Sequence, residues 1–494
     1  MTASTRNDVD DAFLKRTAYN ITGREENEKK TEFVYSPEEK KLLRKINLVT
    51  VPFICVISFI QFLDKYTLNF SAAMGIFEDT KITGNQYSWL GSIYYLGYLA
   101  FQFPNQYFLQ KIPISKYLGA SLILWGITVG CTALAHNFSE LAALRFLLGL
   151  IESVSYPSLY LLISILYRRT EQVIWLGAIP ACNGLGVAFG GLIGLGFLRL
   201  DGAHGLRAWR WCMIILGCLT VGVGCITFLF LPDTAKSPWY RLSPGEIDIV
   251  DERIRDNAVV QSKTIKFEQI VESLKETRFY CYILISFLNQ LVNGCSTFFS
   301  TMIIKSMGFS NTQSILLNIP SGIVSILLMT AAIYFSYRFN EICYVGAVMT
   351  GVNFCGILLL VTLPISGVML LGLFLTSTGM SYLFLLALIS SNCTGYTKKV
   401  FTNSANVAAF CLGNFVGPLL MRQEQAPRYL AGMITYLVAL ATSIILFLYV
   451  RYTYACDNRY RKHLKEENKL LPQVEEREQI DMTDRQDLHF LYRP

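Results

Sequence analysis

The sequence ALRFLLGLIESVSYP covers residues 143–157 and decides how the rest of the chain is interpreted. It places Arg145 and Glu152 inside an apolar run that is long enough to cross a lipid bilayer. Their spacing of seven residues is almost two turns of an α-helix. The two charged side chains therefore lie on nearly the same helix face, about 10 Å apart along the axis. Gly149 and Tyr156 continue that face.

A charged pair in this position has two explanations. A charge in the hydrocarbon core is costly unless it faces a partner or water, and such residues usually line the path of an ion or a substrate. Alternatively, Arg145 and Glu152 form a structural ion pair that locks two helices together. We favour the first explanation, which predicts a water-lined passage beside this helix.

The composition predicts an α-helical protein with many membrane spans. Of the 494 residues, 52% are hydrophobic and only 16% are charged, whereas a soluble protein has about 25% charged residues. The charges concentrate near the two ends of the chain and in a central segment. Between them lie unbroken apolar runs close to the roughly 20 residues that a membrane helix needs. These runs exclude a β-barrel of short alternating strands, and the lipid bilayer is the expected surrounding of the chain.

We predict an all-α polytopic membrane protein with twelve transmembrane helices in two pseudo-symmetric halves. The spans of the first half are predicted at residues 46–68, 87–109, 117–135, 141–167, 173–197 and 211–231. The spans of the second half are predicted at residues 279–304, 315–337, 342–363, 367–391, 400–421 and 429–450.

The charged segments complete the predicted domain organisation. We expect a disordered cytoplasmic arm, an N-terminal half, a cytoplasmic linker, a C-terminal half and a disordered cytoplasmic tail at residues 1–45, 46–231, 232–278, 279–450 and 451–494, respectively. Within the linker, Ser243 and Glu246 have the spacing of a capping box and open a short amphipathic helix. Two halves joined by a cytosolic linker suit a transporter whose halves rock around a central site.

Basic residues set the expected orientation. A basic cluster at residues 40–45 precedes the first span and predicts a cytoplasmic N terminus. The outer loop at 198–210 runs against this rule, because it contains Arg199, Arg207 and Arg210.

Several function classes lack their characteristic residues. The 13 cysteines include no C-x-x-C pair, and the four histidines lie in loops or in the tail. The sequence contains no Walker loop, and its basic residues form no patch of the kind that binds nucleic acid. We therefore expect no enzyme, no catalytic residues, no cofactor, no metal site and no nucleic-acid partner.

A series of short motifs follows the chain from about residue 40 to 455. The motifs are Leu63-Asp64-Lys65 with Asn69 and Gly75, Tyr87-Ser88-Trp89-Leu90-Gly91-Ser92, Arg145-Phe146-x-x-Gly149-x-x-Glu152, Asn183-Gly184, Leu231-Pro232-Asp233, Leu317-Asn318-x-Pro320, Gly395-Tyr396-Thr397-Lys398-Lys399, Gly413-Asn414-x-x-Gly417-Pro418 and Ala426-Pro427-x-Tyr429. In this order they resemble the major facilitator superfamily, specifically its fungal allantoate-permease branch of anion:cation symporters.

The resemblance implies the activity of a secondary active transporter. Members of this branch import small organic anions or zwitterions such as ureides, vitamins, dipeptides, amino acids or sulfur compounds, together with protons. It also implies alternating access and favours the plasma membrane, with the vacuolar and endoplasmic reticulum membranes as alternatives. Two loops depart from the superfamily pattern, because Gln110 and Tyr337 stand where an acid is common.

The candidate site residues come from polar side chains inside the spans. Glu152 and Asp64 are the proton-coupling candidates, although Asp64 and Lys65 could instead be a boundary pair at the lipid headgroups. Arg145 is suited to a carboxylate, since its planar fork makes bidentate contacts. The further substrate-binding candidates are Asn289, Gln290, Asn293 and Thr297 on a polar stripe of the seventh span, and Asn183, Asn318, Tyr382 and Asn414 elsewhere. Packing between helices is the alternative explanation of such a stripe.

Two further alternatives stay open at this point. A non-transporting nutrient receptor on the same scaffold would carry the same motifs without accumulating a substrate. The pair Lys398-Lys399 either sets the topology as positive charge in an inner loop or draws an anion towards the inner gate.

Overall fold

The computed structural model describes residues 36–257, 266–364, 366–376, 381–426, 428–467 and 481–494. Helices of the first half are α2 (Pro37–Ser71), α3 (Ile76–Thr80), α4 (Gly84–Lys111), α5 (Ile114–Thr132), α6 (Phe138–Glu152), α7 (Ser155–Leu166), α8 (Arg169–Leu198), η1 (Ala203–Gly205) and α9 (Ala208–Phe230). The linker contains η2 (Pro238–Tyr240), α10 (Pro244–Asn257) and α11 (Phe267–Lys275). The second half contains α12 (Thr277–Ser306), α13 (Asn311–Leu316), α14 (Asn318–Phe339), α15 (Cys343–Thr362), α16 (Met369–Thr376), α17 (Ser381–Asn392), α18 (Tyr396–Leu419), η3 (Gln423–Gln425) and α19 (Leu430–Glu466).

The spans divide into very apolar helices and more polar ones. Nine of the described helical segments are long and apolar enough to cross a membrane. Three further helices, α4, α12 and α18, have 28, 30 and 24 residues and coincide with the remaining predicted spans. All three of these helices pack across the boundary between the halves. This arrangement is consistent with the twelve predicted helices.

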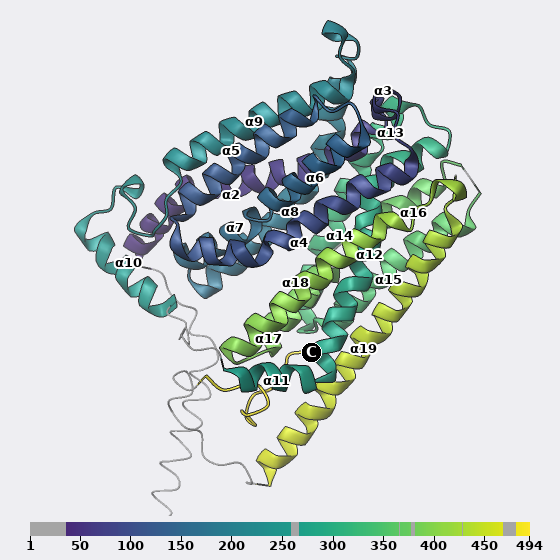
Figure 1. Cartoon of the computed structure of the whole chain (residues 1–494). Helices are drawn as coiled ribbons and strands as arrows, with labels where there is room; N and C mark the ends of the chain where they lie inside the picture. The colour runs from purple at the N-terminus through teal and green to yellow at the C-terminus, as the bar shows by residue number, and fades with distance from the viewer. Residues whose placement is uncertain (1–35, 258–265, 365, 377–380, 427, 468–480) are drawn as a thin grey trace, which may run out of the picture.

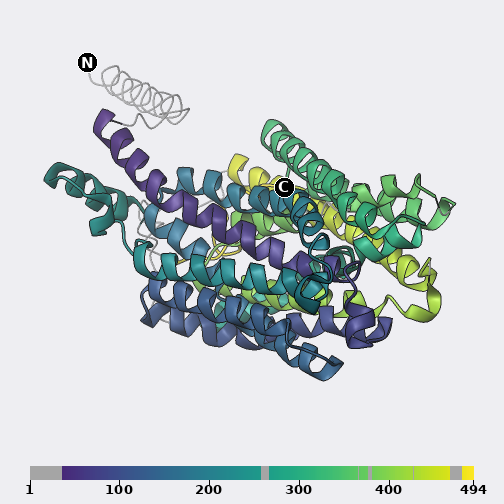
Figure 2. The same cartoon turned by 90° about the horizontal axis from the view of Figure 1, so that it is seen from above.

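The two halves repeat one packing scheme, which confirms the predicted fold class. In the first half α2 packs on α8, α4 on α6, and α5 on α9. The equivalent helices pair in the second half, where α12 packs on α18, α14 on α16, and α15 on α19. Figures 1 and 2 show the purple, blue and teal helices of the first half beside the green-to-yellow helices of the second. The halves meet where α4 contacts α18, α8 contacts α14, and α2 contacts α12.

Close contact between α4 and α6 depends on two glycines. An ideal Cβ on Gly149 would lie 1.9 Å from the carbonyl oxygen of Tyr94, and one on Gly97 would lie 2.1 Å from that of Phe146. These distances are well below van der Waals contact, and both neighbours are backbone atoms that cannot rotate away. The small residues therefore bring the backbones together, as is common between membrane helices.

We expect Gly149→Ala to destabilise the first half, because the added methyl group forces α4 and α6 apart. Overpacking of this kind typically costs about 1–3 kcal/mol, so the melting temperature of the detergent-solubilised protein should fall. Gly222→Ala on α9 is the matched control, since its added Cβ meets nothing within 4 Å. A melting temperature for Gly149→Ala equal to that of Gly222→Ala would contradict the prediction.

The linker contains the predicted capping box, and the tail is more ordered than expected. Reciprocal hydrogen bonds between Ser243 and Glu246 form the predicted capping box at the start of α10. The expectation of disorder after residue 450 is wrong for the described part of the tail, because α19 continues to Glu466 and residues 481–494 pack against the helices. The predicted arm at 1–45 lies mostly outside the described residues, and its last part forms the start of α2.

Two arginines of the basic outer loop before the sixth predicted span form local ion pairs. The Nε of Arg210 donates to Asp79 Oδ2 at 2.7 Å, and Arg207 lies 3.7 Å from a carboxylate oxygen of Asp201. Although burial opposes the shift, hydrogen bonds from Arg210 and Trp209 hold the pKa of Asp79 below its ordinary value. These partners offset the charges of Arg207 and Arg210. The orientation rule counts Lys and Arg rather than net charge, so the loop still runs against it.

Candidate functional site

A lysine and a glutamate meet at the centre of the first half. Lys65 lies on α2, and Glu152 is the last residue of α6, where the fourth span is interrupted before α7 begins at Ser155. The Nζ of Lys65 is 3.6 Å from Oε1 of Glu152. The Glu152 side chain is fully buried, and that of Lys65 is 10% exposed. An opposite charge beside Glu152 offsets part of the cost of its burial.

Several polar atoms around this pair lack hydrogen bonds. Within the described part of the chain, neither carboxylate oxygen of Glu152 has a hydrogen-bond partner. The same holds for both amide atoms of Gln61 and for the hydroxyl of Tyr94, although both side chains lie near enough to Glu152 to act on it as weak hydrogen-bond donors. Buried polar groups are nearly always satisfied in proteins, so this cluster is suited to water, a proton or a polar ligand.

Aromatic rings enclose the ammonium group of Lys65. Its Nζ lies 5.8 Å from the ring centroid of Tyr94 and 5.2 Å from that of Tyr156, both within cation–π range. Asn183 on α8 donates through Nδ2 to the Tyr156 hydroxyl at 3.2 Å. Tyr156 thus connects the predicted substrate-binding residue Asn183 with the Lys65–Glu152 pair.

Asp64 and Arg145 lie on the other side of the same charge cluster. Asp64 is buried and accepts a hydrogen bond from Trp125 Nε1 at 3.0 Å. Arg145 is 4% exposed and interacts electrostatically first with Asp64 and then with Tyr87 and Glu152. Asp64 therefore lies in the interior of the first half, and the alternative of a boundary pair at the lipid headgroups is wrong.

The four charged side chains form one balanced set. Lys65 and Asp64 both act on Glu152, while Arg145 and Lys65 both act on Asp64. Two cations and two anions give the cluster no net charge when all four are ionised. Transfer of a proton to either acid would leave a net positive charge at the centre of the first half.

The polar side chains of the α12 stripe make contacts with different helices. Asn414 on α18 donates to Gln290 Oε1 at 3.0 Å and accepts from Asn293 Nδ2 at 2.9 Å. Thr297 donates to the backbone oxygen of Asn293. Asn289 lies apart from this amide group, because it accepts from Ser443 on α19 at 3.3 Å. The structure thus brings Gln290, Asn293 and Asn414 together and directs Asn289 towards helix packing.

Asn318 belongs to a junction between the halves. Its Oδ1 accepts from the Ser300 hydroxyl at 2.8 Å, and Ser300 Oγ in turn accepts from Asn69 Nδ2 at 2.6 Å. Nearby, Tyr87 on α4 donates to the backbone oxygen of Phe298 at 3.0 Å. These residues lie towards the end of the bundle opposite the linker, which is the predicted outer side.

Tyr382 lies in an aromatic chain that also crosses the boundary. Its ring is 4.9 Å from that of Phe410, which is 6.2 Å from Tyr95 of the first half. The Tyr382 hydroxyl accepts from Asn406 Nδ2 at 3.2 Å. Tyr382 is therefore placed between the halves, whereas Asn318 lies closer to the outer junction.

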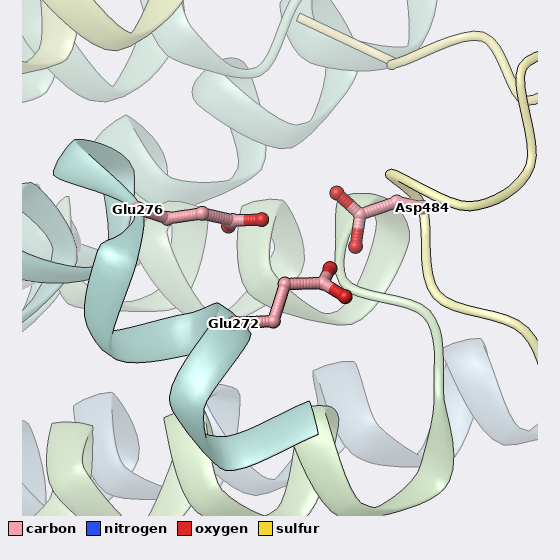
Figure 3. A group of neighbouring side chains, drawn as sticks. All are labelled: Glu272, Glu276 and Asp484. Carbon is pink, nitrogen blue, oxygen red and sulfur yellow. The ribbon is translucent and has the colours of Figure 1, made fainter. Parts of the chain in front are cut away.

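One group of carboxylates in the described chain has the spacing of a metal site. The ligand oxygens of Glu272, Glu276 and Asp484 lie within 4.8 Å of one another (Figure 3). The Nζ of Lys398 contacts all three, at 2.9, 2.5 and 2.8 Å, respectively. The ammonium group thus occupies the position that a cation would take. Because Lys398 is fully enclosed by these acids, it cannot draw an anion towards an inner gate.

Burial alters the ionisation of this cluster. Desolvation, followed by the nearby Asp484 carboxylate, raises the pKa of Glu276 above its ordinary value. Lys398 opposes that shift through its positive charge.

The family follows from a match along most of the chain. A family model described as the Major Facilitator Superfamily matches residues 54–418. The chain belongs to the major facilitator superfamily. In this facilitator the same helix pairs recur in both halves, as described above.

Named relatives of this facilitator are transporters. The thiamine pathway transporter of Saccharomyces cerevisiae is 31% identical over 92% of this chain and 86% of its own length. The allantoate permease of the same yeast is 30% identical over 94% of this chain and 88% of its own length. These matches show a multi-pass membrane transporter related to allantoate permease, as the motifs predicted.

A solved structure confirms the fold of the facilitator. A bacterial homologue of the human lysosomal transporter Spinster superposes with a TM-score of 0.59 at 14% identity, over 84% of this chain and 96% of that protein.

Sequence reasoning did not select Lys65, Gln61, Tyr94 and Tyr156 as members of the central site. A signal was present for one pair, because Gln61 and Lys65 are four residues apart and share a helix face. The adjacent Asp64 points in another direction on the same helix.

Proposed function

We propose that this facilitator imports a small organic anion or zwitterion by proton symport, with alternating access at a site between its halves. The observation that carries the proposal is the buried Lys65–Glu152 pair, whose carboxylate has no hydrogen bond of standard geometry among the described residues. A buried carboxylate without hydrogen bonds is stable as an anion only while a cation compensates it. The protonation of Glu152 therefore depends on whether the Lys65 ammonium pairs with Glu152 or with another anion.

Competition for Lys65 would couple the substrate to the proton. When a substrate carboxylate binds the Lys65 ammonium, Glu152 loses its compensating charge and takes up a proton. When Glu152 is protonated first, the cluster carries a net positive charge and binds an anion more tightly. The two descriptions are one coupling free energy, because linkage between two ligands is reciprocal.

The surroundings support a substrate with a flat or polar body. The rings of Tyr94 and Tyr156 flank the Lys65 ammonium, and Asn183 supplies an amide beside them. Across the boundary, Gln290, Asn293 and Asn414 form an amide group that would exchange its internal hydrogen bonds for bonds to the substrate. The names of the thiamine pathway and allantoate relatives support an organic nitrogen compound, and we include ureides, vitamins, dipeptides, amino acids and sulfur compounds.

Outward opening would require the junction opposite the linker to separate. The hydrogen bonds of Asn69 to Ser300 and of Tyr87 to Phe298 would then break. Asn318 shares this network and is proposed to act in gating as well as in binding.

An uptake screen tests the proposed function. The protein is expressed in a yeast strain that lacks related permeases, and labelled compounds of the classes above are supplied at acidic and neutral pH. We expect one class to accumulate, faster at acidic pH, with accumulation abolished by a protonophore. Signalling without accumulation would instead favour a nutrient receptor, and equal uptake with and without the protonophore would contradict proton coupling. Fractionation of the same cells tests the proposed location in the plasma membrane.

A further inference from the structure

The C-terminal segment Asp481–Pro494, which we name the strap, is tied to several helices of the second half. The backbone of Arg493 exchanges two hydrogen bonds with the Asn392 side chain on α17, at 2.8 and 2.7 Å. The backbone of Tyr492 exchanges two with Asn458 on α19, both at 2.9 Å. The Ile342 N–H before α15 donates to Pro494 at 2.6 Å. The strap therefore lies across the linker ends of α15, α17 and α19.

The side chain of Tyr492 anchors the strap through its ring and hydroxyl group. The ring is stacked 4.7 Å from Tyr454, and the guanidinium groups of Arg278 and Arg461 lie 4.6 and 4.5 Å from its centroid. Its hydroxyl donates to Asp484 Oδ2 at 2.8 Å. Tyr492 is buried, so these contacts persist only while the strap is docked.

The strap also holds α11 of the linker. Asp484 contacts Lys398 of α18, which also binds Glu272 of α11 and Glu276 immediately after it. Figure 3 shows the three carboxylates. Thr483 donates to the second carboxylate oxygen of Glu272 at 3.0 Å. Since the side chain of Lys398 is only 2% exposed, loss of a carboxylate from this group would leave buried charge without a full set of partners.

A second contact connects the strap to the start of α11. The Asp481 carboxylate accepts from the Tyr396 N–H of α18 at 2.6 Å. The same carboxylate accepts from Gln269 of α11 at 3.2 Å, and Gln269 accepts from the Lys398 N–H at 3.1 Å. The strap, α11 and the start of α18 are thus joined at both ends of α11.

The other end of the linker is fixed to the first half. Arg253 of α10 contacts Glu39 of α2 at 2.8 Å and Glu171 of α8 at 2.5 Å. Lys45 of α2 contacts Glu246 of α10 at 2.8 Å. Each half therefore holds one linker helix, and nine peptide steps connect Asn257 to Lys266 between them.

We propose that the strap is a clamp that fixes α11 to the second half and thereby limits how far the linker ends of the two halves separate. With α11 docked, the nine steps from Asn257 to Lys266 span at most about 30 Å. With α11 released and unwound, the free chain continues to Glu276, and its maximal span roughly doubles. Opening of the transporter on the linker side is then less restricted. This inference does not depend on the substrate or on proton coupling.

Two measurements on the full-length protein in nanodiscs test the clamp. Hydrogen exchange reports whether α11 is docked, and spin labels on non-canonical amino acids at Lys111 and Tyr337, both exposed, report the separation of the linker ends. We expect Asp484→Asn and Tyr492→Ala to accelerate exchange in α11 at least about tenfold and to broaden the distance distribution towards longer values. Leu488→Ala is the control, because this strap side chain is 43% exposed.

The outcomes separate the clamp from a merely structural tail. Wild-type exchange in α11 for both variants would overturn the docking of α11 by the strap. Faster exchange with an unchanged distance distribution would overturn the limit on separation. Asp484→Asn should add little in a Lys398→Met background, because the two side chains act through one contact; additive effects would contradict that coupling.

Discussion

Glu152→Gln is expected to abolish proton-driven accumulation of the substrate while leaving exchange of substrate across the membrane. The amide keeps the size and polarity of the carboxyl group but cannot release a proton. Lys65 also loses its nearest anionic partner at 3.6 Å, so the empty site stays positive and binding should persist. The measurement compares net uptake driven by a pH gradient with exchange of labelled for unlabelled substrate in proteoliposomes.

Glu424→Gln provides the control for this prediction, because Glu424 is exposed in the predicted outer loop that contains η3. It removes the same charge without affecting the central cluster. Undiminished uptake with the wild-type pH dependence in Glu152→Gln would remove Glu152 from the mechanism. Asp64→Asn would then be the next variant, since Asp64 is the other acid of the cluster.

Lys65→Met is expected to weaken substrate binding by at least about 30-fold, or ~2 kcal/mol, since removal of one partner of a buried charged contact costs roughly 2–5 kcal/mol. The change leaves the alkyl part of the side chain between Tyr94 and Tyr156 and removes only the charge that would pair with the substrate. Binding to the purified protein, measured by calorimetry at constant pH, gives the affinity.

Two further variants identify the residue that binds the anion. Lys65→Arg keeps the charge and should recover part of the affinity, although the two cations differ in shape and hydration. Lys111→Met is the surface control, because Lys111 is exposed at the end of α4. If Arg145→Met removes binding while Lys65→Met leaves it unchanged, Arg145 is the anion-binding residue and our assignment to Lys65 is wrong.

The fold was largely predictable because apolar length alone identifies membrane helices. The sequence also predicted the spans α4, α12 and α18, which are less apolar than the other nine. These three helices pack at the boundary between the halves, as do the more apolar α2, α8 and α14. The sequence could not reveal this position, because it contains no information about which helices become neighbours.

The central site was predictable only in part. Successive residues on a helix point about 100° apart, so Asp64 and Lys65 necessarily face different surroundings. The rotation of α2 against α5 and α6 decides that Asp64 meets Trp125 while Lys65 meets Glu152. That rotation follows from packing along the whole helix, and the pattern of one sequence does not fix it.

The ordered structure of the C-terminal tail also could not be predicted from the sequence. Tyr492 contacts Asn458, and Arg493 contacts Asn392, a separation of 101 residues. The local sequence shows no helical or strand periodicity, since the contacts are made by backbone groups and by isolated side chains. Such a segment is ordered by the helices on which it packs rather than by a periodic pattern in its own sequence.

The balanced set of Lys65, Arg145, Asp64 and Glu152 has an electrical consequence. Moving one net charge through a membrane potential of 100 mV changes the free energy by about 2.3 kcal/mol, whereas a neutral assembly is insensitive to the voltage. A monovalent anion carried with one proton keeps the loaded cluster neutral, so its import would draw no current and respond only to the two concentration gradients. A zwitterion carried with one proton would move positive charge inward, and the same transporter would then be driven by voltage.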